Sequence, residues 1–259
     1  MSKKIGLALS GGGARGFAHI GVLKVLAEHD IKFDMIAGTS AGAIIGGCLA
    51  AGMTPAEMET MSKKVGYINM MRPSFSLRGA LSNAPMGNFL RRELPVTRFE
   101  DLPIPFAAVA YNLTAGKETV LSETGDLVTA IRASCAVPGV FAPVEGENGM
   151  LFVDGGVTNV MPVDVVRAMG ADIVIAVDLL ACGSDFNGVS GTAVGIMIRS
   201  AMTLLRASAS YQGSRADLVI VPPIAHLRPD QIRKRDEFFA PGEAAARENI
   251  DAILTFIEQ

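Results

Sequence analysis

Ser40 is the first residue whose surroundings indicate chemistry. It lies in the pattern G-x-S-x-G between Gly38 and Gly42, where an apolar stretch typical of a strand runs into a stretch typical of a helix. Glycines at these positions allow the sharp turn that exposes a serine hydroxyl, and they leave room for a substrate. The helix expected over residues 41–51 would point its N-terminal amides at the serine, which suits an oxyanion. Ser40 is therefore a candidate nucleophile, although the pattern alone also fits an ordinary glycine-rich turn.

A serine nucleophile needs a base, and histidine is the usual one. Of the three histidines, only His226 follows Ser40 in the sequence, as the order in an α/β-hydrolase would require. In that fold, however, several strands precede the nucleophile, and here only one expected strand precedes that of Ser40. We therefore interpret His226 as a surface residue. His19 and His29 fall on the first expected helix, and we interpret His19 as a helical histidine satisfied by hydrogen bonds.

The alternative base is a carboxylate. Asp154 follows a short expected strand and precedes Gly155 and Gly156, so it should be exposed at a strand end, where sites gather on open parallel sheets. An aspartate with a pKa of about 3.9 is a weak base in water, but it can serve if it is held within hydrogen-bond reach of the serine in a partly dry site. Asp178 also ends an expected strand. It lacks flanking glycines, and we expect it to cap a loop.

A glycine-rich loop, GGGARG over residues 11–16, follows the first expected strand and precedes a helix. Consecutive N–H groups of Gly11, Gly12 and Gly13 would form a preorganised anion site, so we expect them to make the oxyanion hole. Arg15 adds a cation with two open interpretations. It could contact a substrate anion such as a phosphate headgroup, or it could brace the loop through a salt bridge.

The same loop fits the dinucleotide-binding fingerprint G-x-G-x-x-G. Asp34 falls near the spacing expected for the acid that binds a ribose. That acid should end the second strand, whereas Asp34 begins one and Ser40 stands at its far end. This difference counts against nucleotide binding.

Two strand–turn–helix units within the first 50 or so residues predict an α/β fold with a mainly parallel sheet. Further strands are expected at 103–111, 118–122, 150–153, 172–178 and 217–221, and further helices after Thr54, at 125–133 and 162–169, and from Pro241 to the end. Val194, Met197, Ile198, Ala201, Leu204 and Leu205 form one helical face, which is expected to pack in the core. Residues 181–191 are expected to be a mobile loop. Without a repeat or a long linker, residues 1–259 should form a single domain.

Composition limits the function classes. The 259 residues are 49% hydrophobic, yet no apolar run reaches the roughly 18–20 residues of a membrane span. The net charge of −3 argues against a nucleic-acid partner. Three scattered cysteines show neither disulfide nor metal spacing, so no cofactor or metal is expected and the reducing cytoplasm is the expected compartment. The oligomeric state is not indicated.

Residues 66–82 read as irregular chain in which Arg72 and Arg78 alternate with apolar side chains, including Met70, Phe75 and Leu77. One interpretation is a flap that transiently contacts a membrane surface, with cations toward headgroups and apolar residues toward acyl chains. That contact would place the protein at the inner face of the membrane. The other interpretation is a surface loop with a few core anchors, which the lack of a clean amphipathic helix favours.

The three motifs together, in this order, resemble the patatin-like phospholipases, most closely their compact bacterial members. The similarity is carried by residues 11–16, 38–42 and 154–156 and by the segment 132–138, and it extends over about 4–178. The resemblance implies a Ser–Asp dyad without histidine, a three-layer α/β/α fold and hydrolysis of acyl esters in lipids. Carried over, Ser40 is the nucleophile, Asp154 the base and the glycine loop the oxyanion hole. A different class, a lipid- or partner-binding regulator with little turnover, stays open as the alternative.

Overall fold

The structure is a computed structural model that describes residues 3–74, 77–184 and 193–258. In these residues an eight-stranded sheet has the order β10-β9-β1-β2-β5-β8-β7, and β6 also pairs with β5. Strands β10, β9, β1, β2 and β5 are mutually parallel, and β6, β7 and β8 join antiparallel. The strands are β1 Ile5–Leu9, β2 Met35–Thr39, β5 Phe106–Asn112, β6 Lys117–Ser122, β7 Val144–Glu145, β8 Leu151–Asp154, β9 Ile173–Val177 and β10 Leu218–Ile220. The mainly parallel sheet is confirmed.

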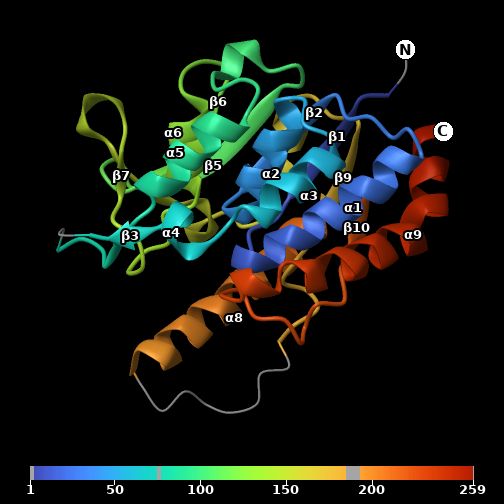
Figure 1. Cartoon of the computed structure of the whole chain (residues 1–259). Coiled ribbons are helices and arrows are strands. Elements are labelled where there is room, and N and C mark those ends of the chain that lie inside the picture. The colour runs from blue at the N-terminus through green and yellow to red at the C-terminus, as the bar shows by residue number, and fades with distance from the viewer. Residues whose placement is uncertain (1–2, 75–76, 185–192, 259) are drawn as a thin grey trace.

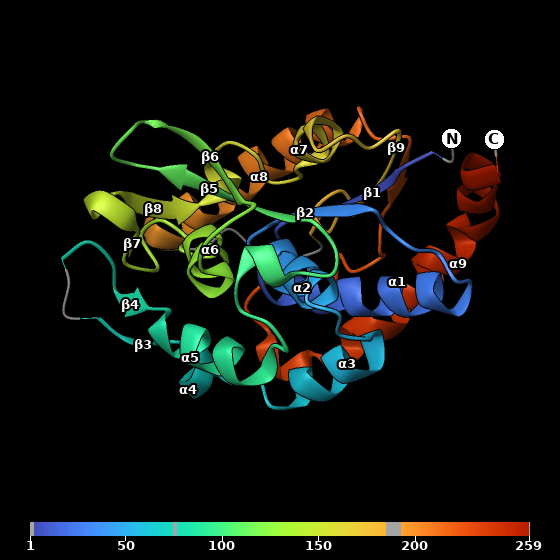
Figure 2. The same ribbon diagram turned by 90° about the horizontal axis from the view of Figure 1, so that it is seen from above.

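Helices cover both faces of the sheet, and Figure 2 shows the three layers edge-on. On one face lie α1 Phe17–Glu28, α2 Ala41–Ala50, α3 Pro55–Lys63, α5 Ala84–Glu93, α6 Leu127–Ser134 and α9 Asp236–Glu258. On the other face lie α7 Val163–Ala168 and α8 Ala193–Gly213. A short helix α4, Tyr67–Met70, leads into a small hairpin of β3 Arg72–Pro73 and β4 Leu81–Ser82 (Figure 1). Among the described helices none is both long and apolar enough to cross a bilayer.

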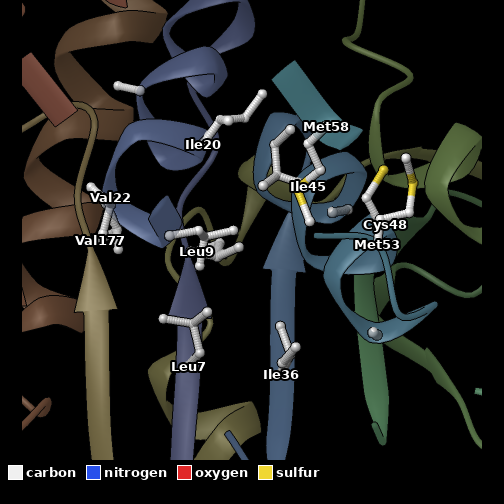
Figure 3. Close-up of a cluster of buried hydrophobic side chains, with 14 of the residues drawn as sticks. Leu7, Leu9, Ile20, Val22, Ile36, Ile45, Cys48, Met53, Met58 and Val177 are labelled. Atoms are coloured by element: carbon white, nitrogen blue, oxygen red, sulfur yellow. The ribbon is translucent and has the colours of Figure 1, made fainter. Parts of the chain in front are cut away.

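Alternation along the strands assigns side chains to the two faces. Leu7 and Leu9 of β1 point with Ile36 of β2 toward α1 and α2 (Figure 3), and all three are fully buried. The residues between them are small: Ala8 and its neighbour Ala37 face the cluster around α7. Because both faces of these parallel strands are covered, the strands read as continuous apolar runs in the sequence.

The closest helix pair is α1 with α9, and glycines allow the contact. A Cβ built on Gly21 would lie 2.2 Å from the carbonyl oxygen of Phe239, and one on Gly242 would lie 2.2 Å from that of Ala18. Any larger side chain at either position would push the helices apart. The structure places the start of α9 at Asp236 and Pro241 inside the helix, so the expected start at Pro241 was five residues too late.

Strands β2 and β8, which lead to Ser40 and Asp154, meet on one edge of β5. Strand β6 occupies one edge of β5 over residues 107–112, so β2 and β8 must share the other. Strand β2 runs parallel to β5 and pairs Thr39 with Val109, while β8 runs antiparallel and pairs Asp154 with Ala110. The carboxyl ends of β2 and β8 therefore point at each other along this edge.

Two helices differ from expectation. Helix α5 lies in a stretch for which no element was predicted, although Met86, Phe89 and Leu90, all buried, have helical spacing and could have indicated it. The predicted core face of α8 was wrong where side chains are described: Leu204 is 72% exposed and Ala201 is exposed, while Leu205 is half-buried. The side chains of Val194, Met197 and Ile198 lie outside the described residues, as does most of the predicted loop at 181–191.

Candidate active site

Ser40 is held in a backbone conformation that non-glycine residues rarely adopt. It is the residue before α2 and has φ 54° and ψ −120°. Its two flanking glycines make the turn sterically feasible, because a Cβ on Gly38 would lie 2.3 Å from the carbonyl oxygen of Gly42, and one on Gly42 would lie 2.1 Å from that of Leu9. Such strain is stored where the surrounding structure over-determines it, commonly at functional sites. The sharp turn predicted at Ser40 is thus present in the fold.

The end of α6 holds both Ser40 and Asp154. The backbone N–H of Ser40 donates to the Ser134 hydroxyl oxygen (2.8 Å), and the Cys135 thiol donates to the carbonyl oxygen of Ser40 (3.2 Å). The next residue, Ala136, accepts the backbone N–H of Asp154 through its carbonyl oxygen (3.0 Å). Three successive residues therefore set the position of the candidate nucleophile relative to the candidate base. The sequence pointed to this segment only through the family resemblance, without a role for Ser134 or Cys135.

Asp154 lies at the end of β8, as expected, but it is only 6% exposed, so the expectation of an exposed side chain was wrong. It is buried because this strand end pairs with β5 and is bonded to the end of α6. Its Oδ1 accepts the backbone N–H of Gly156 (2.8 Å). Its Oδ2 is buried and has no hydrogen-bond partner among the described residues. Burial raises the pKa of Asp154 to about 6, and the nearby Ser40 hydroxyl and the Gly156 N–H partly oppose this rise by favouring the charged form. The carboxylate therefore has an open acceptor and a basicity well above that of an exposed aspartate.

The glycine loop lies against Ser40, but its three amides are not equivalent. A Cβ built on Gly11 would lie 3.3 Å from the Cβ of Ser40, which shows how closely the loop approaches. The N–H of Gly11 donates to the carbonyl oxygen of Val160 (2.9 Å), so this amide is already used, contrary to the expectation. For the N–H groups of Gly12 and Gly13 the described residues show no acceptor. These two amides are the remaining oxyanion candidates.

Arg15 braces the loop from behind. Its side chain is 1% exposed, and its guanidinium donates to the carbonyl oxygens of Leu227 (2.9 Å), Leu179 (3.1 Å) and Gly183 (3.0 Å). The expected contact with a substrate anion is therefore wrong for this structure, because burial removes the guanidinium from the surface that a substrate would reach. Bracing holds as an interpretation, with carbonyl oxygens in place of the expected acidic partner.

His19 supports the strand end before the glycine loop. Its ring is fully buried, and Nε2 lies 2.9 Å from the carbonyl oxygen of Ser10. Burial lowers the pKa of His19 to about 4, while the Ser10 carbonyl partly opposes the shift, so the ring is neutral at pH 7. Its Nδ1 is buried without a hydrogen-bond partner in the described chain, so the expected full satisfaction is only half met. His226 is exposed, as expected.

Two further expectations concern acids. Asp178 caps the loop after β9, since its Oδ1 accepts the N–H groups of Leu180 (2.7 Å) and Ala181 (3.1 Å), and this confirms the prediction. Asp34 lies at the start of β2 and accepts the N–H of Ile5 (2.7 Å), at the opposite end of the strand from Ser40. Where the structure describes the chain, no three His, Cys, Asp or Glu side chains gather as metal ligands would.

Known proteins with similar sequences define the class of this chain. The family model for patatin-like phospholipases matches residues 7–167. An uncharacterized NTE family protein of Mycobacterium bovis is 41% identical over 181 residues, which cover 69% of this chain and 49% of that protein. Patatin-like phospholipase domain-containing protein 7 of Mus musculus is 34% identical over 182 residues, or 68% of this chain and 13% of that protein. The chain belongs to the patatin-like phospholipase family.

The fold comparison agrees with this assignment. The crystal structure of VipD from Legionella pneumophila matches with a TM-score of 0.58 and covers 97% of this chain and 67% of that one, at 15% sequence identity. At this identity the likeness concerns the fold alone, which is the three-layer α/β/α arrangement described above. The chain spans about half the length of the mycobacterial relative and a small part of the mouse one.

Proposed function

We propose that this protein hydrolyses carboxylic esters of lipids, the acyl bonds of phospholipids or lysophospholipids, through a Ser40–Asp154 dyad. Family membership supports the lipid substrate class. The observation that carries the proposal is the end-to-end meeting of β2 and β8 on β5, next to a buried Asp154 oxygen with no other partner. The proposed reaction uses no histidine: His19 is fully buried beside Ser10, and His226 is exposed on the surface.

The proposed reaction has two halves. Ser40 Oγ attacks the ester carbonyl carbon as its proton passes to Asp154 Oδ2, and the N–H groups of Gly12 and Gly13 stabilise the resulting oxyanion. Collapse of the tetrahedral intermediate breaks the bond to the leaving alcohol, which takes the proton from Asp154, and leaves an acyl ester on Ser40. Water then attacks this ester, gives its proton to Asp154, and releases the fatty acid as Ser40 Oγ recovers a proton.

A raised aspartate pKa makes this proton transfer feasible. A general base is most effective when its pKa lies near the working pH. Burial of Asp154 supplies that shift, and the Ser40 hydroxyl together with the Gly156 N–H on Oδ1 limits it by favouring the charged carboxylate. The strained turn at Ser40 adds orientation, because the hydroxyl cannot relax into the helix that follows.

Hydrolysis of p-nitrophenyl esters of short and long chain, and of lysophospholipids, tests the proposal. Ser40→Ala and Asp154→Asn should each lower kcat/KM by at least about 10³-fold, because each residue carries a step that the other cannot perform. His226→Ala is the matched control and should keep parental activity. Near-full turnover by Asp154→Asn together with loss in His226→Ala would contradict the dyad. Circular dichroism of each variant checks that the fold is intact.

A fluorophosphonate probe separates this proposal from a lipid-binding regulator. An activated Ser40 should form a stable adduct, detectable by intact mass and absent in Ser40→Ala. A chain that binds lipid without forming the adduct would favour the regulator.

A further inference from the structure

The segment α4–β3–β4 is anchored on both sides of the candidate active site. On one side the Tyr67 hydroxyl donates to the carbonyl oxygen of Asp230 (2.9 Å), and the adjacent Pro229 accepts the N–H of Ala14 in the glycine loop (2.7 Å). On the other side Leu81 exchanges backbone hydrogen bonds with residues 140–142, which follow the α6 end that holds Ser40 and Asp154. The segment therefore lies at the rim of the site.

This rim exposes large apolar side chains. Two large apolar side chains of this segment are almost wholly exposed: Ile68 on α4, at 93%, and Leu77 between β3 and β4, which is fully exposed. Tyr67, next to Ile68, is partly exposed. A hollow of about 400 Å³ lies next to these two α4 residues and the short helix η5, Ile232–Lys234, and is lined in part by Arg233. Large apolar side chains left exposed along one segment mark an interaction site.

The charged residues within this segment have one sign. Residues 63–82 contain four lysines and arginines and no aspartate or glutamate, although the whole chain carries a net charge of −3. Lys63 and Lys64 pair with Glu59 and Glu93. Asp230, beside Tyr67, pairs with Arg228. Arg72 is exposed on β3, and Arg233 lies over the Tyr67 ring with 6.0 Å between guanidinium carbon and ring centroid. Within the described ranges neither arginine forms an ion pair. Both cations are therefore available to an anionic partner.

We infer that Tyr67, Ile68, Arg72, Leu77 and Arg233 form a rim patch that docks the protein on the surface of an anionic lipid bilayer. Apolar side chains enter the boundary between headgroups and acyl chains, while guanidiniums stay at the level of the phosphates. A cationic, apolar surface complements an anionic bilayer better than it complements a neutral bilayer. The inference rests on the proposed function for its purpose, since docking at the rim would bring a lipid ester to Ser40.

The patch also has a suitable place in the whole molecule. In Figures 1 and 2 the β3–β4 hairpin lies at one extremity and both termini lie at the other. The termini mark the end of the sheet at which β1 begins, so the hairpin is on the side toward which the parallel strands run. A bilayer at this extremity would therefore face the carboxyl end of β2, where Ser40 stands.

Binding to vesicles tests the inference separately from catalysis. Cosedimentation uses the Ser40→Ala protein, so that no lipid is consumed, with vesicles of phosphatidylglycerol and phosphatidylcholine or of phosphatidylcholine alone. We expect partitioning to the anionic vesicles that weakens with salt. Arg72→Gln with Arg233→Gln should reduce it roughly 30-fold, since each cation near an anionic surface contributes about 1 kcal/mol. Ile68→Asp with Leu77→Asp should reduce it at least about tenfold.

Matched controls are Lys32→Glu, an exposed cation just before β2 at the opposite end of the sheet, and Val120→Asp on β6. Both should bind vesicles like the parent. In the active protein the patch variants should hydrolyse a soluble short-chain ester at the parental rate and lose hydrolysis of vesicle lipid. Equal binding to neutral and anionic vesicles, or unchanged binding by both double variants, would overturn the inference. So would double variants that change the oligomeric state of the protein and leave vesicle binding unchanged. Failure of the proposed function alone would leave vesicle binding intact and ester hydrolysis absent.

Discussion

At the scale of single residues, the candidate site depends on two opposite environments at the adjoining ends of β2 and β8. Ser40 is in a strained conformation at a half-exposed turn, whereas Asp154 is almost fully buried at the end of a strand. Exposure lets a substrate reach the hydroxyl, and burial makes the carboxylate more basic. The glycines matter equally: Gly38, Gly42 and Gly11 each stand where a Cβ would meet backbone or the nucleophile itself.

The raised pKa of Asp154 predicts the acid limb of the pH–rate profile. The proposed dyad requires the charged form of Asp154, so kcat/KM for a soluble ester should be level above about pH 7 and fall about tenfold per pH unit below about pH 6. The measurement is kcat/KM between pH 4.5 and 8, with activity restored on return to pH 7 as the control for unfolding. A profile level down to pH 4.5 would show that this carboxyl is not the base.

Residue-scale reasoning from sequence succeeded where a side chain's neighbours along the chain define its setting. Ser40 and Asp178 are examples, because a strand end and its adjacent residues determine where the chain turns and what a side chain can cap. For Asp154 the place at a strand end was predicted, but its burial was not. The substrate contact considered for Arg15 and the free amide expected of Gly11 were wrong for the opposite reason. The partners of these two residues are Leu227, Leu179 and Val160, which are far away in the sequence.

At the scale of elements, the end of α6 is the piece that joins the two halves of the site. Its Ser134 side chain is fully buried and accepts the N–H of Ser40, while its next residues hold the carbonyl of Ser40 and the N–H of Asp154. A helix end is well suited to this task, because its last residues leave regular hydrogen bonding and can serve neighbouring strands.

Ser134→Ala should therefore loosen the turn. It leaves a poorly hydrated Ser40 N–H without an acceptor, which typically costs about 1–3 kcal/mol in the free energy of unfolding, and it should slow fluorophosphonate labelling of Ser40 several-fold. Urea unfolding and labelling kinetics measure the two effects. Ser62→Ala is the matched control, because Ser62 is also buried and donates only to Glu59 within its own helix. Labelling of Ser134→Ala at the parental rate would show that this contact does not position the nucleophile.

Helices and strands with a clear hydrophobic period were predictable from the sequence. The side chains that a helix buries were not, because they depend on the elements that pack against it. Strand β9 and helix α1 follow from apolar runs and helical spacing in the sequence. Helix α8 shows the limit, since its stripe is apolar but Leu204 faces solvent while Leu205 packs beside Gly156. Spacing shows that a face exists, and only the fold shows what covers it.

At the scale of the whole molecule, burial links the stability of the fold to pH through two groups of opposite sign. His19 has its pKa lowered from 6.5 to about 4, so the unfolded chain binds a proton first and stability falls as pH drops below about 6.5. Asp154 has its pKa raised from 3.8 to about 6, so the native state binds its proton first and stability rises as pH drops below about 6. The two effects partly cancel in the parent.

Comparing variants separates the contribution of His19 to the pH dependence of unfolding from that of Asp154. In an Asp154→Asn background, His19 should cost about 2 kcal/mol of unfolding free energy between pH 7 and pH 5, and His19→Gln should remove most of that slope while keeping a donor for the Ser10 carbonyl. Urea unfolding at the two pH values measures it. Equal slopes with and without His19 would mean that the ring is not held neutral in the native state.

Local pattern was enough to identify the α/β class, the strained turn at Ser40, the glycine loop and the aspartate at a strand end, because each of these is a property of a few consecutive residues. The tertiary structure alone decided that β2 and β8 share one edge of β5, that Arg15 turns inward and Gly11 is already bonded, and that the rim patch stands beside the site. These are outcomes of contacts between segments well separated along the chain, from 44 residues for Ala110 and Asp154 to 212 residues for Arg15 and Leu227. The free energy of these contacts depends on which surfaces the fold brings together, and the spacing of residues along the chain does not show which surfaces those are.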